Sequence, residues 1–186
     1  VANIVASQLS WNLLDSGAIY RAFALAASNR NVLVDNIDEL LTLASNLDLR
    51  FESEPSINKL SIYLDNIEVS SELRTEETAE LASKFAMISP LRESLLVRQQ
   101  KFKQPPGLVA DGRDMGTVVF IDAPFKVFLT ANVEERARRR LKQLQDKGIA
   151  GILSQTLEEV RNRDERDANR KHSPLKPSKD ALIIDT

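Results

Sequence analysis

The sequence contains no cysteine and only one histidine, His172, among its 186 residues. Disulfide bonds and thiolate metal sites are therefore excluded, and histidine cannot supply a cluster of metal ligands. Because a chain without cysteine fits a reducing compartment, we expect a cytoplasmic protein.

Long apolar runs and a dominant charge are also missing. No stretch approaches the roughly 20 apolar residues that a membrane-spanning helix needs, and we expect no secretory leader. Lys and Arg total 25 against 27 for Asp and Glu, so the chain has no overall field that attracts nucleic acid or an acidic membrane. We expect neither partner, and any anion site must be local.

The composition, 42% hydrophobic and 28% charged, suits one compact domain with a real core. Short apolar strands alternate with segments of helical periodicity, which predicts an α/β fold with a mainly parallel sheet. The expected strands are Trp11–Leu14, Leu108–Ala110 (buried on both faces), Lys126–Thr130 and Ala181–Ile184. The expected helices are Val1–Leu9, Ala18–Ser28, Asp38–Leu47, Thr75–Lys103 with an interruption at Pro90, Glu134–Lys147 and Leu157–Asn169.

A small antiparallel unit interrupts this alternation. Leu49–Phe51, Leu60–Leu64 and Ile67–Val69 are typical of short strands, and Asp65-Asn66 is expected to form the turn between the last two. The unit is interpreted as an insertion into the α/β fold.

Three acidic residues, Asp15, Asp111 and Asp185, follow directly on predicted strands. Open parallel sheets bind ligands at the carboxyl ends of their strands. The sequence therefore favours a ligand site among these strand ends.

The first polar cluster is LLDSGAIYR, from Leu13 to Arg21. Ser16 and Gly17 allow a tight turn that presents hydroxyl and amide donors, and Arg21 can bind phosphate oxygens with its planar fork. Taken alone, the motif is weak and better fits a loop followed by an exposed arginine on a helix.

The second cluster is LVADGRDMGTVVF, from Leu108 to Phe120. Gly112 lets the backbone leave the strand close to a ligand, Arg113 offers a phosphate fork, and Asp114 offers an acceptor. Opposite charges side by side suggest a site for an anion and an amine, although a self-neutralising surface turn has the same composition.

The third cluster is EEVRNRDERDANR, from Glu158 to Arg170. One helical face carries Arg163, Asp167 and Arg170, which can place two cations around one carboxylate. A solvent-exposed helix with surface salt bridges has the same pattern. The preceding charged helix contains Arg136, Arg138, Arg139 and Arg140, and arginine favours bidentate phosphate recognition.

Together these segments resemble the bacterial cytidylate kinases, nucleoside monophosphate kinases of the P-loop class. Six motifs occur in the family's order and at its spacing: LLDSGAIYRAFALAA, ELRTEETAELASKFA, LRESLLVRQQKF, GLVADGRDMGTVVFIDAPFKVFLTA, EERARRRLKQLQDKG and RDERDANRKHSPL. The resemblance implies one P-loop NTPase-type three-layer domain over residues 1–186. It further implies a β-containing insertion that binds the nucleoside monophosphate at about 30–90 and a helical lid at about 132–170.

The resemblance also implies a role for each matching residue. The phosphate-facing, catalytic positions are Arg21, Arg113, Arg163 and Arg170, with Ser16 in the monophosphate-binding turn. Ser83, Arg92 and Asp114 match the positions that read cytosine, and Asp167 matches an acceptor for the ribose hydroxyls. Arg136, Arg139 and Arg140 match the lid over ATP, and Asp111 lies near Mg²⁺, which it contacts through water.

The implied activity is ATP-dependent phosphorylation of CMP and dCMP in pyrimidine nucleotide metabolism, by a monomer that binds only small nucleotides. Arginines would offset the repulsion between two anionic reactants, and lid closure would exclude water. Uracil would present a carbonyl where Asp114 needs a donor.

One departure concerns the motif G-x-x-x-x-G-K-[ST], which is absent from the 186 residues. We interpret the sequence as truncated, without the family's first strand, phosphate loop and last helix, and we expect this stretch alone to be inactive. A non-catalytic nucleotide-binding remnant is the alternative. A related kinase with another acceptor is disfavoured because Ser83, Arg92 and Asp114 occur together.

Overall fold

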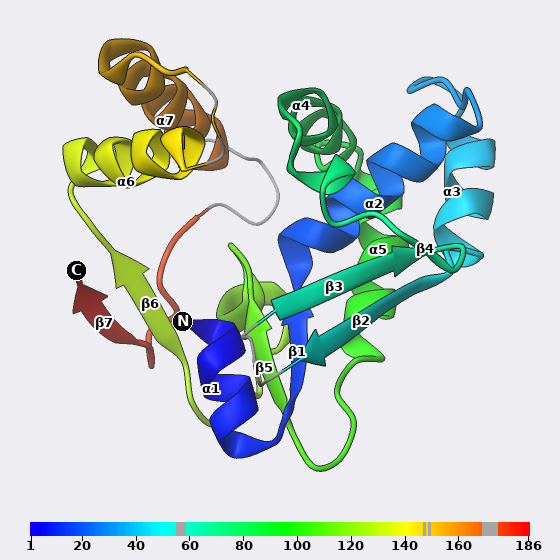
Figure 1. Ribbon diagram of the computed structural model, residues 1–186. Coiled ribbons are helices and arrows are strands. Elements are labelled where there is room, and N and C mark those ends of the chain that lie inside the picture. Colours follow the sequence, from blue (N-terminus) through cyan, green and yellow to red (C-terminus); the bar gives the residue numbers. More distant parts are fainter. Residues whose placement is uncertain (55–58, 147, 149, 169–174) are drawn as a thin grey trace. The chain divides into compact units, whose positions relative to one another are not determined.

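The computed structural model describes residues 1–54, 59–146, 148, 150–168 and 175–186. The chain forms two compact units, Val1–Met115 and Gly116–Thr186, and each is described by itself (Figure 1). A π-helical turn, Met115–Val119, begins at the end of the first unit.

The first unit combines helices with two small sheets (Figure 1). Its elements are α1 (Ala2–Leu9), β1 (Asn12–Asp15), α2 (Ser16–Asn29), α3 (Ile37–Ser45), β2 (Leu49–Glu54), β3 (Lys59–Leu64), β4 (Ile67–Glu68), a 3-10 turn (Glu72–Arg74), α4 (Glu76–Phe85), α5 (Ser89–Gln100) and β5 (Leu108–Asp111).

Strands β1 and β5 pair in parallel, with Asn12 opposite Leu108 and Asp15 opposite Asp111. The parallel pairing predicted from the sequence is therefore confirmed. The turn expected at residues 15–17 is wrong, because α2 already begins at Ser16. Asp15 is the N-cap residue, and its carboxylate accepts a hydrogen bond from the Ala18 amide at 2.9 Å.

The three-stranded sheet β2–β3–β4 is antiparallel, as expected for the small inserted unit. Asp65 and Asn66 connect β3 to β4 with φ values of 50° and 65°. Two consecutive positive φ values are typical of the two-residue type I′ hairpin turn. The backbone twist of this turn matches the right-handed twist of the strands that it joins. The predicted turn is therefore confirmed.

Helix packing forms the core of this unit. Phe23 of α2 and Phe85 of α4 are fully buried and meet edge to face, with ring centroids 5.1 Å apart. Leu91 and Leu95 of α5 are also fully buried. Pro90 lies in the first turn of α5, where its missing N–H costs no hydrogen bond, so the predicted interruption is confirmed.

Strand β5 differs from expectation, since Leu108, Val109 and Ala110 are only half-buried. Among the described residues β5 pairs with β1 alone, so one of its edges has no neighbouring strand. A strand with a single neighbour cannot be enclosed like the middle strand of a parallel sheet. The prediction that β5 is buried on both faces is therefore wrong.

The second unit contains β6 (Val127–Thr130), α6 (Val133–Gln145), α7 (Leu153–Ala168) and β7 (Leu182–Asp185). Strands β6 and β7 pair in parallel, and α6 packs against α7 (Figure 1). Helix α7 begins earlier than predicted, and near its start the hydroxyl of the buried Thr156 donates to the Ile152 carbonyl at 3.1 Å. No helix in the described part of the chain is long and apolar enough to cross a membrane.

Candidate functional site

Two carboxylates lie side by side where β1 and β5 end. Asp15 and Asp111 are direct partners in the parallel register, as the positions of both residues after apolar strands predicted. Burial and the nearby Asp15 charge raise the pKa of Asp111, and the Arg113 guanidinium opposes this shift. Two acidic side chains at one sheet edge favour a bound cation.

Ser16 starts α2 directly beside these carboxylates, and its hydroxyl donates to Gln99 Oε1 at 2.7 Å. Gln99 is buried on α5, and its Nε2 donates to the Leu95 carbonyl at 3.3 Å. The sequence reasoning missed Gln99. The available signal was its spacing, because Gln99 continues the buried stripe of Leu91 and Leu95 at intervals of four residues.

Gly112 brings the end of β5 close to the start of α2. A Cβ atom built on Gly112 would lie 2.8 Å from Ser16 Cβ and 2.9 Å from Met115 Cε. The close approach that the sequence suggested for this glycine is thus made to Ser16. It fixes the spacing between the start of α2 and the segment that carries Arg113 and Asp114.

We expect Gly112→Ala to lower the free energy of unfolding by about 1–3 kcal/mol, the usual cost of overpacking, because the Ser16 Cβ cannot swing aside. Urea unfolding checks this value. Gly116→Ala is the matched control. A Cβ atom built on Gly116 would lie 3.2 Å from its nearest neighbour, Cδ of the flexible Lys126 side chain, which can move aside. Equal stability of the two variants would contradict this account of Gly112.

Arg92 and Asp114 form an ion pair, with 2.7 Å between Arg92 Nη2 and Asp114 Oδ2 and both side chains 13% exposed. Arg92 Nη1 also donates to the Ala86 carbonyl at 3.2 Å, and the guanidinium carbon lies 6.0 Å from the centre of the Tyr20 ring. These contacts fix Arg92 in one orientation. The structure therefore brings together two of the three residues expected to read a base.

The remaining predicted residues of this unit lie on nearby elements. Ser83 is half-buried on α4, whose C-cap residue is Ala86, the acceptor of the Arg92 bond. Arg113 is half-buried and directly follows Gly112. Arg21 is half-buried on α2, and its Nη2 lies 3.6 Å from the position of a Cβ built on Gly17. The start of α2 therefore carries an arginine close to Asp15.

In the second unit, three arginines expected in the lid lie on α6. Arg136 binds Asp164 of α7 with both terminal nitrogens, and Arg136 Nε donates to the Ala131 carbonyl at 3.1 Å. The hydrogen bonds to Asp164 raise the pKa of Arg136. Arg139 donates to Glu135 at 2.9 Å and to Thr186 at 3.0 Å, and Arg140 is half-buried.

The third predicted cluster is described only in part. Arg163 is exposed on α7, and Asp167 follows one helical turn later, as the spacing predicted. The side chain of Asp167 and the whole of Arg170 lie outside the described residues. In the portion that the structure describes, no group of three or more His, Cys, Asp or Glu side chains could hold a metal ion.

Comparison with known proteins identifies the family. The family profile described as "Cytidylate kinase" matches residues 1–186. Cytidylate kinase of Shewanella sediminis is 50% identical over 186 residues, which are 100% of this chain and 81% of the relative. Cytidylate kinase of Photorhabdus laumondii is 53% identical over 182 residues, 98% of this chain and 79% of the relative. The chain therefore belongs to the cytidylate kinase family.

Proposed function

We propose that the protein transfers the γ-phosphoryl group of ATP to the phosphate of CMP and of dCMP. The observation that carries the proposal is the mostly enclosed Arg92–Asp114 ion pair, whose Asp114 directly follows Arg113. Curated relatives named cytidylate kinase support the same reaction. A non-catalytic nucleotide-binding remnant is less favoured, because the family match covers the whole chain.

The acceptor base is read by fixed polar groups. Asp114 accepts a hydrogen bond from the exocyclic amine of cytosine, while Arg92 and Ser83 donate to the ring acceptors. The ion pair orients Arg92 before the base arrives, so little side-chain entropy is lost on binding. Uracil brings a carbonyl oxygen toward the Asp114 carboxylate, which leaves two acceptors facing each other.

The acceptor phosphate is held by the paired N–H groups of two arginine side chains. Arg21 and Arg113 bind it from the start of α2 and the end of β5, beside the Ser16 hydroxyl. Arg163 and Arg170 face the transferred phosphate, and Asp167 accepts from the ribose hydroxyls. Because a phosphate oxygen is the nucleophile, the reaction needs no general base, and the chain acts by positioning and charge compensation.

The strand-end carboxylates fit Mg²⁺, which prefers oxygen ligands and in such enzymes uses one or two carboxylates plus substrate phosphates. Asp111 would hold the ion through water, and a cation there would relieve the repulsion from Asp15 that contributes to the raised pKa of Asp111. Magnesium would neutralise charge that develops on the donor phosphates.

The donor side involves the helices of the second unit. Arg139 and Arg140 of α6 would reach the ATP phosphates, and α6 and α7 would form a lid within residues 132–170 that excludes water. The segment at 30–90, with β2, β3 and β4, would form the monophosphate-binding insertion. Excluding water matters because its attack would hydrolyse ATP without forming CDP.

A direct test mixes the purified full-length protein with ATP, Mg²⁺ and CMP and follows the nucleotides by chromatography. We expect CDP and ADP in equal amounts, and dCDP when dCMP replaces CMP. Hydrolysis of ATP without CDP formation, or binding of CMP without turnover, would contradict the proposed function.

A further inference from the structure

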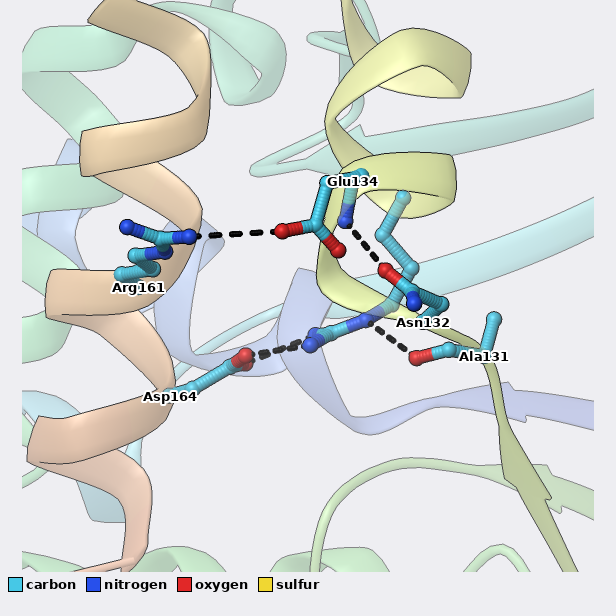
Figure 2. A network of polar contacts seen from close by, with 6 residues as sticks. Ala131, Asn132, Glu134, Arg161 and Asp164 are labelled. Carbon is cyan, nitrogen blue, oxygen red and sulfur yellow. Dashed lines mark hydrogen bonds and ion pairs between the residues drawn. The ribbon is translucent and has the colours of Figure 1, made fainter. Parts of the chain in front are cut away.

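Arg136 holds three elements of the second unit together. It belongs to α6, its Nε donates to the Ala131 carbonyl directly after β6, and its two terminal nitrogens bind Asp164 of α7. Figure 2 shows Arg161 of α7 beside Glu134 of α6, and Asp164 of α7 facing the side chain that donates to Ala131, which is Arg136. The start of α6 is fixed as well, because Asn132 accepts from the Glu134 amide at 2.8 Å.

The geometry of Arg136 argues against a direct role as an ATP ligand. A guanidinium binds phosphate best through a pair of parallel N–H groups, and Asp164 occupies such a pair in Arg136, with 2.8 Å between Nη1 and Oδ1. The Nε–H is used by Ala131. If these N–H groups of Arg136 bound ATP, the two charge-assisted hydrogen bonds to Asp164 would have to break.

A second ion pair between the same helices has a single, longer contact and is more exposed to solvent. Arg161 of α7 makes a single contact with Glu134 of α6 at 3.3 Å, and the side chains are 59% and 48% exposed. The Arg136 and Asp164 side chains are 36% and 28% exposed. Exposed single-contact pairs contribute little, so of these two pairs between the described parts of α6 and α7, Arg136–Asp164 contributes more to holding the helices together.

We propose that Arg136 and Asp164 are positioning residues: their pair couples α6, with Arg139 and Arg140, to α7, with Arg163, so that these arginine side chains move as one body. The inference rests on the proposed function and changes the role that the family resemblance implied for Arg136. Asp164 immediately follows Arg163, so a loosened pair displaces the neighbouring phosphate-facing arginine. A closed lid that is misaligned admits water.

The test compares Arg136→Lys, Asp164→Asn and the double variant of the full-length protein with the wild type. We measure kcat, the KM for ATP and the ratio of CDP formed to ATP consumed. Each single variant is expected to lower kcat by roughly 10-fold, which is within the loss that a small misplacement of the reacting groups causes. Each is also expected to lower the ratio of CDP formed to ATP consumed below one. The double variant should be no worse than the worse single one, because both changes break one contact.

Two further variants separate this role from others. Arg161→Gln breaks the weaker contact between the same helices and is expected to leave kcat and the ratio within about twofold of the wild type. Asp164→Glu keeps the carboxylate and should keep the ratio near one. Thermal unfolding of every variant identifies a loss that comes only from misfolded protein, which lowers kcat without changing the ratio.

The outcomes are distinct. If Arg136 binds ATP directly, Arg136→Lys raises the KM for ATP while Asp164→Asn leaves it unchanged or lowers it, and the inference is overturned. A ratio of one in both single variants, or additive losses in the double variant, also overturns it. A wild type that forms no CDP overturns the proposed function and the inference together.

Discussion

Arg113→Lys in the full-length protein is expected to lower kcat for CMP phosphorylation by roughly 100-fold or more, the scale for losing one preorganised group at a developing charge. Arg113 lies two residues after the end of β5, between the strand-end carboxylate Asp111 and Asp114, the proposed reader of the base. Lysine keeps the positive charge but cannot make two parallel hydrogen bonds to a phosphate. The loss therefore reports geometry rather than charge.

Steady-state kinetics with saturating ATP and CMP measures this effect. Arg30→Lys is the matched control, because Arg30 is a surface arginine paired with Asp65, and both side chains are 46% exposed. We expect the control to keep kcat within about twofold. Unchanged kinetics in Arg113→Lys would place Arg113 among residues that only support the fold.

Asp114→Ala is expected to weaken CMP binding by about 1–3 kcal/mol, the usual scale for a lost hydrogen bond to a charged group, while ATP affinity changes little. It also leaves the Arg92 charge without its 2.7 Å partner in a mostly enclosed position. The free energy of unfolding should therefore fall too, by less than the roughly 3–5 kcal/mol typical of fully buried pairs.

Isothermal calorimetry with CMP and urea unfolding measure the two effects separately. Glu80→Ala removes the acid of the exposed Lys84–Glu80 pair on α4, whose N–O distance is 3.1 Å, and should change neither quantity by more than about 0.5 kcal/mol. If Asp114→Ala binds CMP as tightly as the wild type, Asp114 does not read the base.

Local patterns predicted the elements that position the site. Parallel strands end at the same edge of a sheet, so Asp15 and Asp111 could be placed together from sequence, and their register confirms it. Proline chemistry predicted the break before α5, and the Asp65-Asn66 pair predicted the hairpin. The break and the hairpin each depend on a few consecutive residues, whereas the meeting of Asp15 and Asp111 follows from the general rule that parallel strands end at one edge.

The contacts that orient the side chains could not be predicted in this way. Arg92 and Asp114 are 22 residues apart, Ser16 and Gln99 are 83 apart, and Arg136 and Asp164 are 28 apart. These contacts depend on how whole helices pack, which periodicity does not specify. Charge runs on α6 and α7 suggested phosphate ligands or a solvated face, and only the structure shows that Arg136 is occupied by Asp164.

We propose that the Arg92–Asp114 pair recognises cytosine. The most direct measurement is kcat/KM of the full-length protein for CMP and for UMP, with the same ATP and Mg²⁺. If the Arg92–Asp114 pair reads cytosine, kcat/KM for CMP exceeds that for UMP by at least roughly 10-fold. This is the lower end of the range expected when uracil loses the hydrogen bond to Asp114 and places a carbonyl oxygen against its carboxylate. Equal kcat/KM values for CMP and UMP would contradict the account.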